Sequence, residues 1–125
     1  AGGRFRICGI AVNREAQSMA STALHKESWY QAKILRWLKE KYPSAFVWKA
    51  AAGPYTQGGI PDICAVIDGH FFGFEVKRPR VGRLSPLQAQ AIRAINAAGG
   101  TAAVVHTPED VQRVISIALA DRTAW

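Results

Sequence analysis

Three ionisable side chains stand out in a mostly apolar stretch of the sequence: Asp62, Glu75 and Lys77. Between the two acids lies Asp68-Gly69, a pair suited to the two positive-φ positions of a type I′ hairpin turn. A two-residue turn at this point places Asp62 opposite Glu75, with their side chains about 5 Å apart on one face of the hairpin. Lys77 lies two residues beyond Glu75 and therefore on the same face.

Two carboxylates placed opposite each other repel unless a cation or a shared proton lies between them. Oxygen ligands without His or Cys suit Mg²⁺ or Mn²⁺ better than Zn²⁺. Such an ion can lower the pKa of a bound water and neutralise charge on a phosphodiester, while Lys77 orients the attacking water or stabilises the transition-state charge. The spacing also fits an ordinary salt bridge between Lys77 and the two acids, so both interpretations stay open.

A further acid, Glu27, falls with Gln31, Ile34 and Leu38 on the inward stripe of a predicted helix. A ligand for a bound ion would explain an acid at that position. The alternative is an acid of a first helical turn, which the helix macrodipole favours.

A basic loop follows the hairpin. Four cations fall within seven residues: Lys77, Arg78, Arg80 and Arg83. Such a loop can follow the phosphates of a nucleic acid, and the alternative is a solvated basic loop.

Other residues near the hairpin are weaker candidates for contacting a ligand. Gly58 and Gly59 allow a close backbone approach, although a plain loop before a strand explains them as well. Lys49 and Tyr55 are further candidates for the same surface.

The composition is that of one globular domain with a basic surface. The chain has 125 residues, 49% of them hydrophobic, and 16 Lys and Arg against nine Asp and Glu give a net charge of +7. This charge favours a polyanionic partner such as nucleic acid or an acidic membrane surface, with a generally basic surface as the alternative. No apolar run approaches the roughly 18 residues of a membrane span, and no signal-peptide cleavage pattern is present.

The two cysteines, Cys8 and Cys64, lack the spacing of zinc ligands. We therefore expect a reduced, cytoplasmic protein with a buried thiol at Cys64.

The predicted elements follow the order α-β-β-β-α-β-α. Periodicity and turn signals indicate a helix over 24–42, a strand over 45–51, two strands around Asp68-Gly69, a helix after Ser85, a strand over 101–106 and a last helix after Thr107. Ser85, Pro86 and Gln88 form a capping box. Apolar residues on both faces of the hairpin predict a sheet covered on both sides.

We expect residues 23–125 to form one domain. Residues 1–22 form an N-terminal segment, either partly from outside the natural protein or a strand that adds to the edge of the sheet.

Three segments together resemble the PD-(D/E)XK nuclease superfamily and, within it, the VRR-NUC (virus-type replication-repair nuclease) family. They are GGIPD at 58–62, FEVKRP at 74–79 and LSPLQ at 84–88. The resemblance covers about residues 25 to 115. It implies a restriction-endonuclease-like α/β core with a central mixed four-stranded sheet flanked by helices, and hydrolysis of DNA phosphodiester bonds with Mg²⁺ or Mn²⁺.

The resemblance also assigns roles to residues. It implies that Glu27, Asp62, Glu75 and the backbone carbonyl of Val76 bind the metal ion, that Lys77 is the catalytic lysine, and that Gln88 is the family's glutamine on the following helix. The site would thus consist of Asp62, Glu75, Lys77 and Gln88 beside a DNA-binding surface of Lys49, Tyr55, Gly58, Gly59, Arg78, Arg80 and Arg83.

Stand-alone members of this family resemble resolvases of four-way (Holliday) junctions that act as homodimers, and the size fits a phage or bacterial source. Two symmetric cuts in a junction call for a two-fold dimer. A less selective nickase or flap nuclease of phage DNA metabolism is the second hypothesis, and a basic DNA-binding protein without catalysis is the third.

Overall fold

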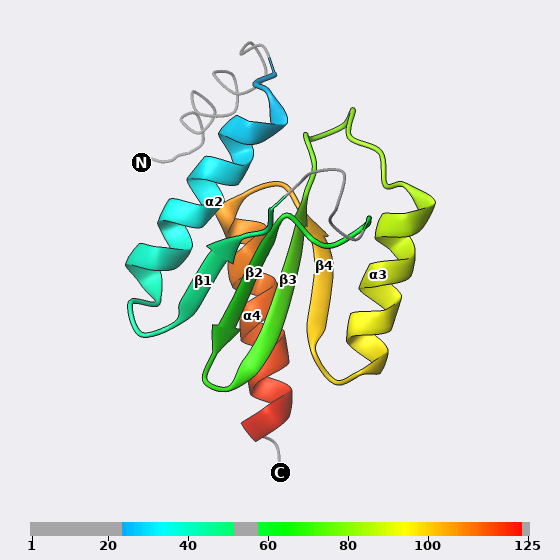
Figure 1. Cartoon of the computed structure of the whole chain (residues 1–125). Coiled ribbons are helices and arrows are strands. Elements are labelled where there is room, and N and C mark those ends of the chain that lie inside the picture. The colour runs from blue at the N-terminus through cyan, green and yellow to red at the C-terminus, as the bar shows by residue number, and fades with distance from the viewer. Residues whose placement is uncertain (1–23, 52–57, 124–125) are drawn as a thin grey trace, which may run out of the picture.

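The computed structural model describes residues 24–51 and 58–123. Seven elements follow one another along this part of the chain: α2 (Glu27–Lys41), β1 (Phe46–Lys49), β2 (Ile63–Ile67), β3 (His70–Val76), α3 (Pro86–Ala97), β4 (Thr101–Val105) and α4 (Pro108–Thr123) (Figure 1). The predicted α-β-β-β-α-β-α order is confirmed. The predicted N-terminal segment, with its added edge strand, lies outside the described residues.

The four strands form one open mixed sheet in the order β1-β2-β3-β4. β1, β2 and β3 are antiparallel neighbours, whereas β3 and β4 are parallel. A parallel pair requires a crossover, and α3 supplies it. The carboxyl ends of β3 and β4, at Val76 and Val105, consequently lie side by side.

The β2–β3 hairpin has the predicted turn and register. Asp68 and Gly69 have φ angles of 51° and 78°, the two positive values that a type I′ turn requires. Ile67 pairs with His70, and the register continues as far as Ile63 opposite Phe74. Because β2 begins at Ile63, Asp62 lies one residue before the strand.

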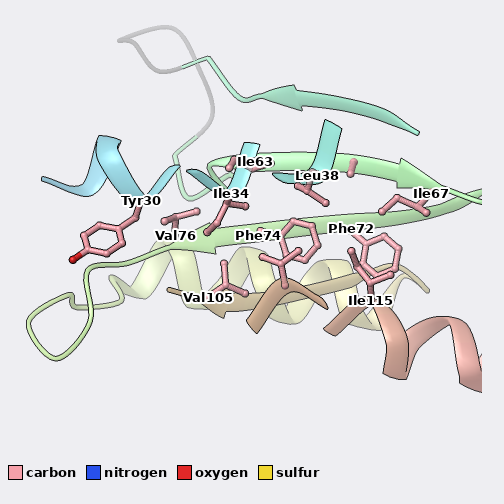
Figure 2. Close-up of a cluster of buried hydrophobic side chains, with 12 residues drawn as sticks. Tyr30, Ile34, Leu38, Ile63, Ile67, Phe72, Phe74, Val76, Val105 and Ile115 are labelled. Carbon is pink, nitrogen blue, oxygen red and sulfur yellow. The ribbon is translucent and has the colours of Figure 1, made fainter. Parts of the chain in front are cut away.

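The main core lies between one face of the sheet and the helices α2 and α4 (Figure 2). The sheet contributes the apolar set predicted for one hairpin face, in which Phe72 and Phe74 are fully buried. Ile34 and Leu38 of α2 and Ile115 of α4 close over this layer. This burial is the main source of stabilisation, at about 25 cal/mol for each Å² of apolar surface removed from water.

The second face of the sheet is covered by α3 alone. Gly73 admits Pro61 on this face, since a Cβ atom at Gly73 would lie 2.8 Å from the Pro61 Cγ. The prediction of a sheet covered on both sides is wrong at the β1 end, where Phe46 is 69% exposed. One helix is about 10 Å wide and strands lie about 4.8 Å apart, so α3 covers only the strands nearest to it.

The helix ends show the predicted capping. At α3, the Ser85 Oγ accepts a hydrogen bond from the Gln88 amide, and the Gln88 side chain accepts one from the Ser85 amide. At α4, the Thr107 Oγ accepts from the Asp110 amide while the Asp110 carboxylate accepts from the Thr107 amide. In the described part of the chain, none of the helices combines the length and the apolar character that crossing a membrane would take.

Two isoleucines on α4 test this arrangement. Ile115 is 1% exposed and Ile117 is 65% exposed. We expect Ile115→Ala to lower the free energy of unfolding by about 2 to 5 kcal/mol, because it leaves a cavity, and Ile117→Ala to change it by about 0.5 kcal/mol or less. Urea unfolding of both variants measures the difference, and equal losses would contradict the placement of α4.

Candidate active site

Asp62 is fixed to the strands on both sides of it. Its Oδ2 accepts a hydrogen bond of 2.8 Å from the Val76 amide at the end of β3, and its backbone carbonyl accepts one of 2.8 Å from the Ala50 amide. The side chain therefore turns across the hairpin toward Glu75, although Asp62 itself lies outside β2. The acid pair predicted from the turn is present.

Glu75 is almost completely buried, with 1% of its side chain exposed. Its Oε2 accepts a 2.9 Å hydrogen bond from the Gln88 Nε2 and lies 3.6 Å from the Lys77 Nζ. Its Oε1 is also buried and has no hydrogen-bond partner. Burial and the neighbouring Asp62 carboxyl group raise the pKa of Glu75 to about 8, and Lys77 opposes this only in part. At neutral pH and without a bound cation, Glu75 is thus mainly protonated.

Lys77 follows the last residue of β3 and is held through its backbone. Its amide donates to the Val105 carbonyl at 3.0 Å, and its carbonyl lies 2.8 Å from the Nδ1 of His106. His106 is in turn fixed by its own amide, which donates to the Asp110 Oδ2 at 2.9 Å. The side chain of Lys77 is 11% exposed, so its ammonium group stays beside Glu75.

His106 is a supporting residue that the sequence analysis missed. The histidines show no metal-ligand spacing, and nothing in the spacing of His106 relates it to Lys77. The signal that could have found it is its place directly after β4, provided that β4 is known to run parallel to β3.

Gln88 combines two roles that the sequence suggested separately. Its Oε1 accepts from the Ser85 amide, which completes the capping box. Because this oxygen is occupied by a donor, the amide nitrogen faces Glu75. The N-terminal turn of α3 is thereby joined to the acid pair.

Glu27 stands apart from this pair. Its Oε2 accepts a 3.2 Å hydrogen bond from the Gln31 Nε2 on the next turn of α2. Within residues 24–51 and 58–123, no three His, Cys, Asp or Glu side chains come together in a group that could hold a metal ion. Its position in the first turn of α2 fits the macrodipole interpretation, and its role as a ligand stays a prediction.

The two glycines before Asp62 pack against α3. Gly59 has a φ of +87°, and a Cβ atom there would lie 2.4 Å from the Leu87 carbonyl oxygen. A Cβ atom at Gly58 would lie 3.1 Å from the flexible Leu87 side chain. Gly59 therefore packs its backbone closely against α3, and the approach of a ligand to Gly58 and Gly59 stays a prediction. Lys49 is exposed at the end of β1, and Tyr55 lies outside the described residues.

The basic loop folds back over the stem of Lys77. The Gly82 amide donates to the Arg78 carbonyl at 3.0 Å, and a Cβ atom at Gly82 would lie 2.7 Å from that of Lys77. Arg80 and Arg83 are exposed, while Arg78 is half-buried and its buried Nε has no hydrogen-bond partner. The loop thus presents cations beside the acid pair.

The pair has the chemistry of a site for a hard divalent cation. A buried carboxylate oxygen without a partner is costly, and a cation bound at Glu75 Oε1 and Asp62 would satisfy it. Both donors are oxygens, the atoms that Mg²⁺ and Mn²⁺ prefer. These residues therefore fit the predicted ion.

Cys64 lies on the same face as the pair and is buried, as predicted, with 3% exposed. Burial, with a smaller contribution from the charge of Asp62, raises the pKa of its thiol. A protonated thiol is a poor nucleophile, so Cys64 acts as a packing residue.

The raised pKa of Glu75 predicts a pH-dependent stability in the absence of metal. Between its ordinary value of 4.5 and about 8, the folded chain binds a proton that the unfolded chain releases. The contribution of Glu75 to stability must therefore fall as the pH rises through this window. We expect Glu75→Gln to become more stable than the unsubstituted chain with rising pH, by on the order of a few kcal/mol at pH 8.

Melting temperatures from pH 5 to 8.5 in EDTA measure this difference. Glu40→Gln, at an exposed position on α2, is the control and should give a difference that does not change with pH. A constant difference for Glu75→Gln would contradict the burial of Glu75 as an acid.

The chain resembles known proteins in its structure and not detectably in its sequence. No protein-family model matches the chain, and no curated protein matches it. One solved structure, titled "VRR_NUC domain", is 20% identical, has a TM-score of 0.55, and is matched over 68% of this chain and 92% of that one. Another, titled "VRR_NUC domain protein", is 18% identical, has a TM-score of 0.60, and is matched over 79% of this chain and 92% of that one. This α/β chain with its open mixed sheet therefore has the fold of a VRR_NUC domain.

Proposed function

We propose that the chain is a nuclease of the VRR-NUC family within the PD-(D/E)XK superfamily, and that it hydrolyses DNA phosphodiester bonds with Mg²⁺ or Mn²⁺. The observation that carries this proposal is the pair formed by half-buried Asp62 and buried Glu75. The Glu75 Oε1 has no hydrogen-bond partner, whereas its Oε2 lies near Lys77 and accepts a hydrogen bond from Gln88. The fold shared with VRR_NUC domains supports it.

The proposed metal ligands are the Asp62 and Glu75 carboxylates and the Val76 carbonyl, with Glu27 as a further ligand. A bound Mg²⁺ or Mn²⁺ would lower the pKa of a water molecule and neutralise charge on the phosphodiester. Glu75 must lose its proton to act as a ligand, because only a carboxylate binds such an ion well. The raised pKa of Glu75 therefore makes binding weaker at low pH.

Lys77 is the proposed catalytic lysine. Its ammonium group lies 3.6 Å from the Glu75 Oε2 and can orient the attacking water or stabilise charge on the phosphate. Gln88 holds the Glu75 Oε2 and so leaves the Oε1 for the ion. The cations of the basic loop, Arg78, Arg80 and Arg83, would hold the DNA backbone.

We infer branched DNA as the preferred substrate and a homodimer as the active form. One acid pair cuts one strand, and a four-way junction has two-fold symmetry, so that two chains related by a two-fold axis would make the paired cuts. The net charge of +7 supports a nucleic-acid partner.

The first test is cleavage. The chain is incubated with labelled four-way junction, flapped DNA and linear duplex, with Mg²⁺ or Mn²⁺ and with EDTA. We expect incision that needs the metal ion and falls by about 10³-fold or more in Asp62→Asn and in Lys77→Met, because each removes a group from the reaction centre. Asp121→Asn, at an exposed position on α4, should cut normally.

The substrates distinguish the hypotheses. Preferred cutting of the junction supports the resolvase, and preferred cutting of flaps or equal cutting of all three supports a flap nuclease or nickase. If the unsubstituted chain binds DNA without cutting it, the remaining hypothesis is a basic DNA-binding protein without catalysis.

A second test measures metal binding independently of catalysis. We expect Mg²⁺ or Mn²⁺ to raise the melting temperature of the unsubstituted chain, because the ion binds only the folded state. The rise should be larger at pH 8 than at pH 6, since the ion competes with the proton on Glu75. It should be absent in Asp62→Asn, and an equal rise in this variant would exclude the pair as the binding site.

A further inference from the structure

The outer face of α2 carries a stripe of cations around one tryptophan. Lys26, which precedes the first turn, and Trp29, Lys33 and Arg36 are spaced at i, i+3, i+7 and i+10, so they lie along one side of the helix. All four are exposed. We call these four residues the α2 stripe. The buried residues of the helix, Gln31, Ile34 and Leu38 among them, lie on its opposite side.

Trp29 is held firmly although 40% of it is exposed. Its ring stacks on His25 with 3.7 Å between centroids and meets Tyr30 edge-on at 4.9 Å. The Lys33 Nζ lies over the indole, 4.7 Å from the ring centroid. This contact orders Lys33 on the outer surface of the helix, so that less side-chain entropy would be lost when the ammonium group binds an anion.

The cations of the α2 stripe form no ion pair among the described residues, and they outnumber the acids on that side of the helix by three to one. The two ion pairs among the described residues are Lys77 with Glu75 and Arg113 with Asp110. Lys26, Lys33 and Arg36 make none with any described residue. Glu40 is the acid that follows on the same side of the helix, beyond Arg36. The α2 stripe therefore adds three exposed cations to the surface of a basic chain.

The α2 stripe begins at the active-site end of the molecule. Figure 1 shows the first turn of α2 at the same end as the carboxyl end of β3 and the basic loop. From there the stripe extends along the outer surface, and the ten helical steps from Lys26 to Arg36 span about 15 Å. At about 3.4 Å for each base pair, this equals about four to five base pairs of duplex.

We propose that the α2 stripe binds the phosphate backbone of a DNA arm that leaves the active site. This inference rests on the proposed nuclease function and adds a second contact surface for the same substrate. Lys26, Lys33 and Arg36 contact phosphates, and Trp29 positions Lys33. Cleavage of a branched molecule with long arms would then use both this surface and the basic loop.

The test compares two double variants of the same helix. Lys33→Ala with Arg36→Ala removes two cations of the α2 stripe, and Lys39→Ala with Lys41→Ala removes two exposed cations outside it. Both change the net charge equally, and Ala is well tolerated on a helix surface. Binding in EDTA is measured by fluorescence anisotropy at several salt concentrations, with long-armed branched DNA whose arms have about 20 base pairs.

For the stripe variant, we expect about tenfold weaker binding of long-armed DNA, and a dependence of log K on log salt that is shallower by about 2. The control variant should bind nearly as the unsubstituted chain does.

Equal weakening in both variants would show an effect of net charge and overturn the proposal. Unchanged binding by the stripe variant, while the unsubstituted chain still cuts DNA, would overturn it and leave the proposed function standing. If the unsubstituted chain neither binds nor cuts DNA, both the stripe proposal and the proposed nuclease function are rejected.

Discussion

The close approach of two carboxyl groups in a buried position is the constraint on which the rest of the site depends. Like charges at this distance in an apolar surrounding cannot both stay ionised without a counterion. The raised pKa of Glu75 and the nearby ammonium group of Lys77 meet this requirement without an ion. The same arrangement would suit the proposed divalent cation, because an ion of charge +2 would remove the repulsion.

Three separate elements hold the pair and Lys77 in place. The end of β3 supplies the Val76 amide to Asp62, and the first turn of α3 supplies Gln88 to Glu75. The residue after β4, His106, holds the backbone of Lys77. Since each of these bonds is made by a backbone group or a capped helix turn, the geometry of the pair follows from the packing of the sheet and α3. A site held in this way is pre-organised for the proposed reaction.

Acidic and basic side chains at this end of the molecule differ in their exposure to solvent. The acids of the pair are buried or half-buried, whereas Arg80, Arg83 and the α2 stripe are exposed. A polyanion that approaches this end of the molecule therefore meets cations first and the acids only at the reaction centre. This distribution suits a nucleic acid whose phosphates must come close to two carboxylates, because the exposed cations offset that repulsion.

The sequence by itself determined the local structure. Periodicity gave the helices their positions, Asp68-Gly69 set the turn, and the turn set the register that brings Asp62 opposite Glu75, because each of these depends on residues close in the chain. The capping residues Ser85 and Gln88 also acted as predicted. Tertiary structure decided the rest. Parallel pairing of β3 with β4 joined His106 to Lys77, α3 left Phe46 uncovered, and the packing of α2 set the place of Glu27, which accepts a hydrogen bond from Gln31. These outcomes depend on contacts between elements far apart in the chain, whose relative positions are fixed by packing and leave no periodic signal in the sequence.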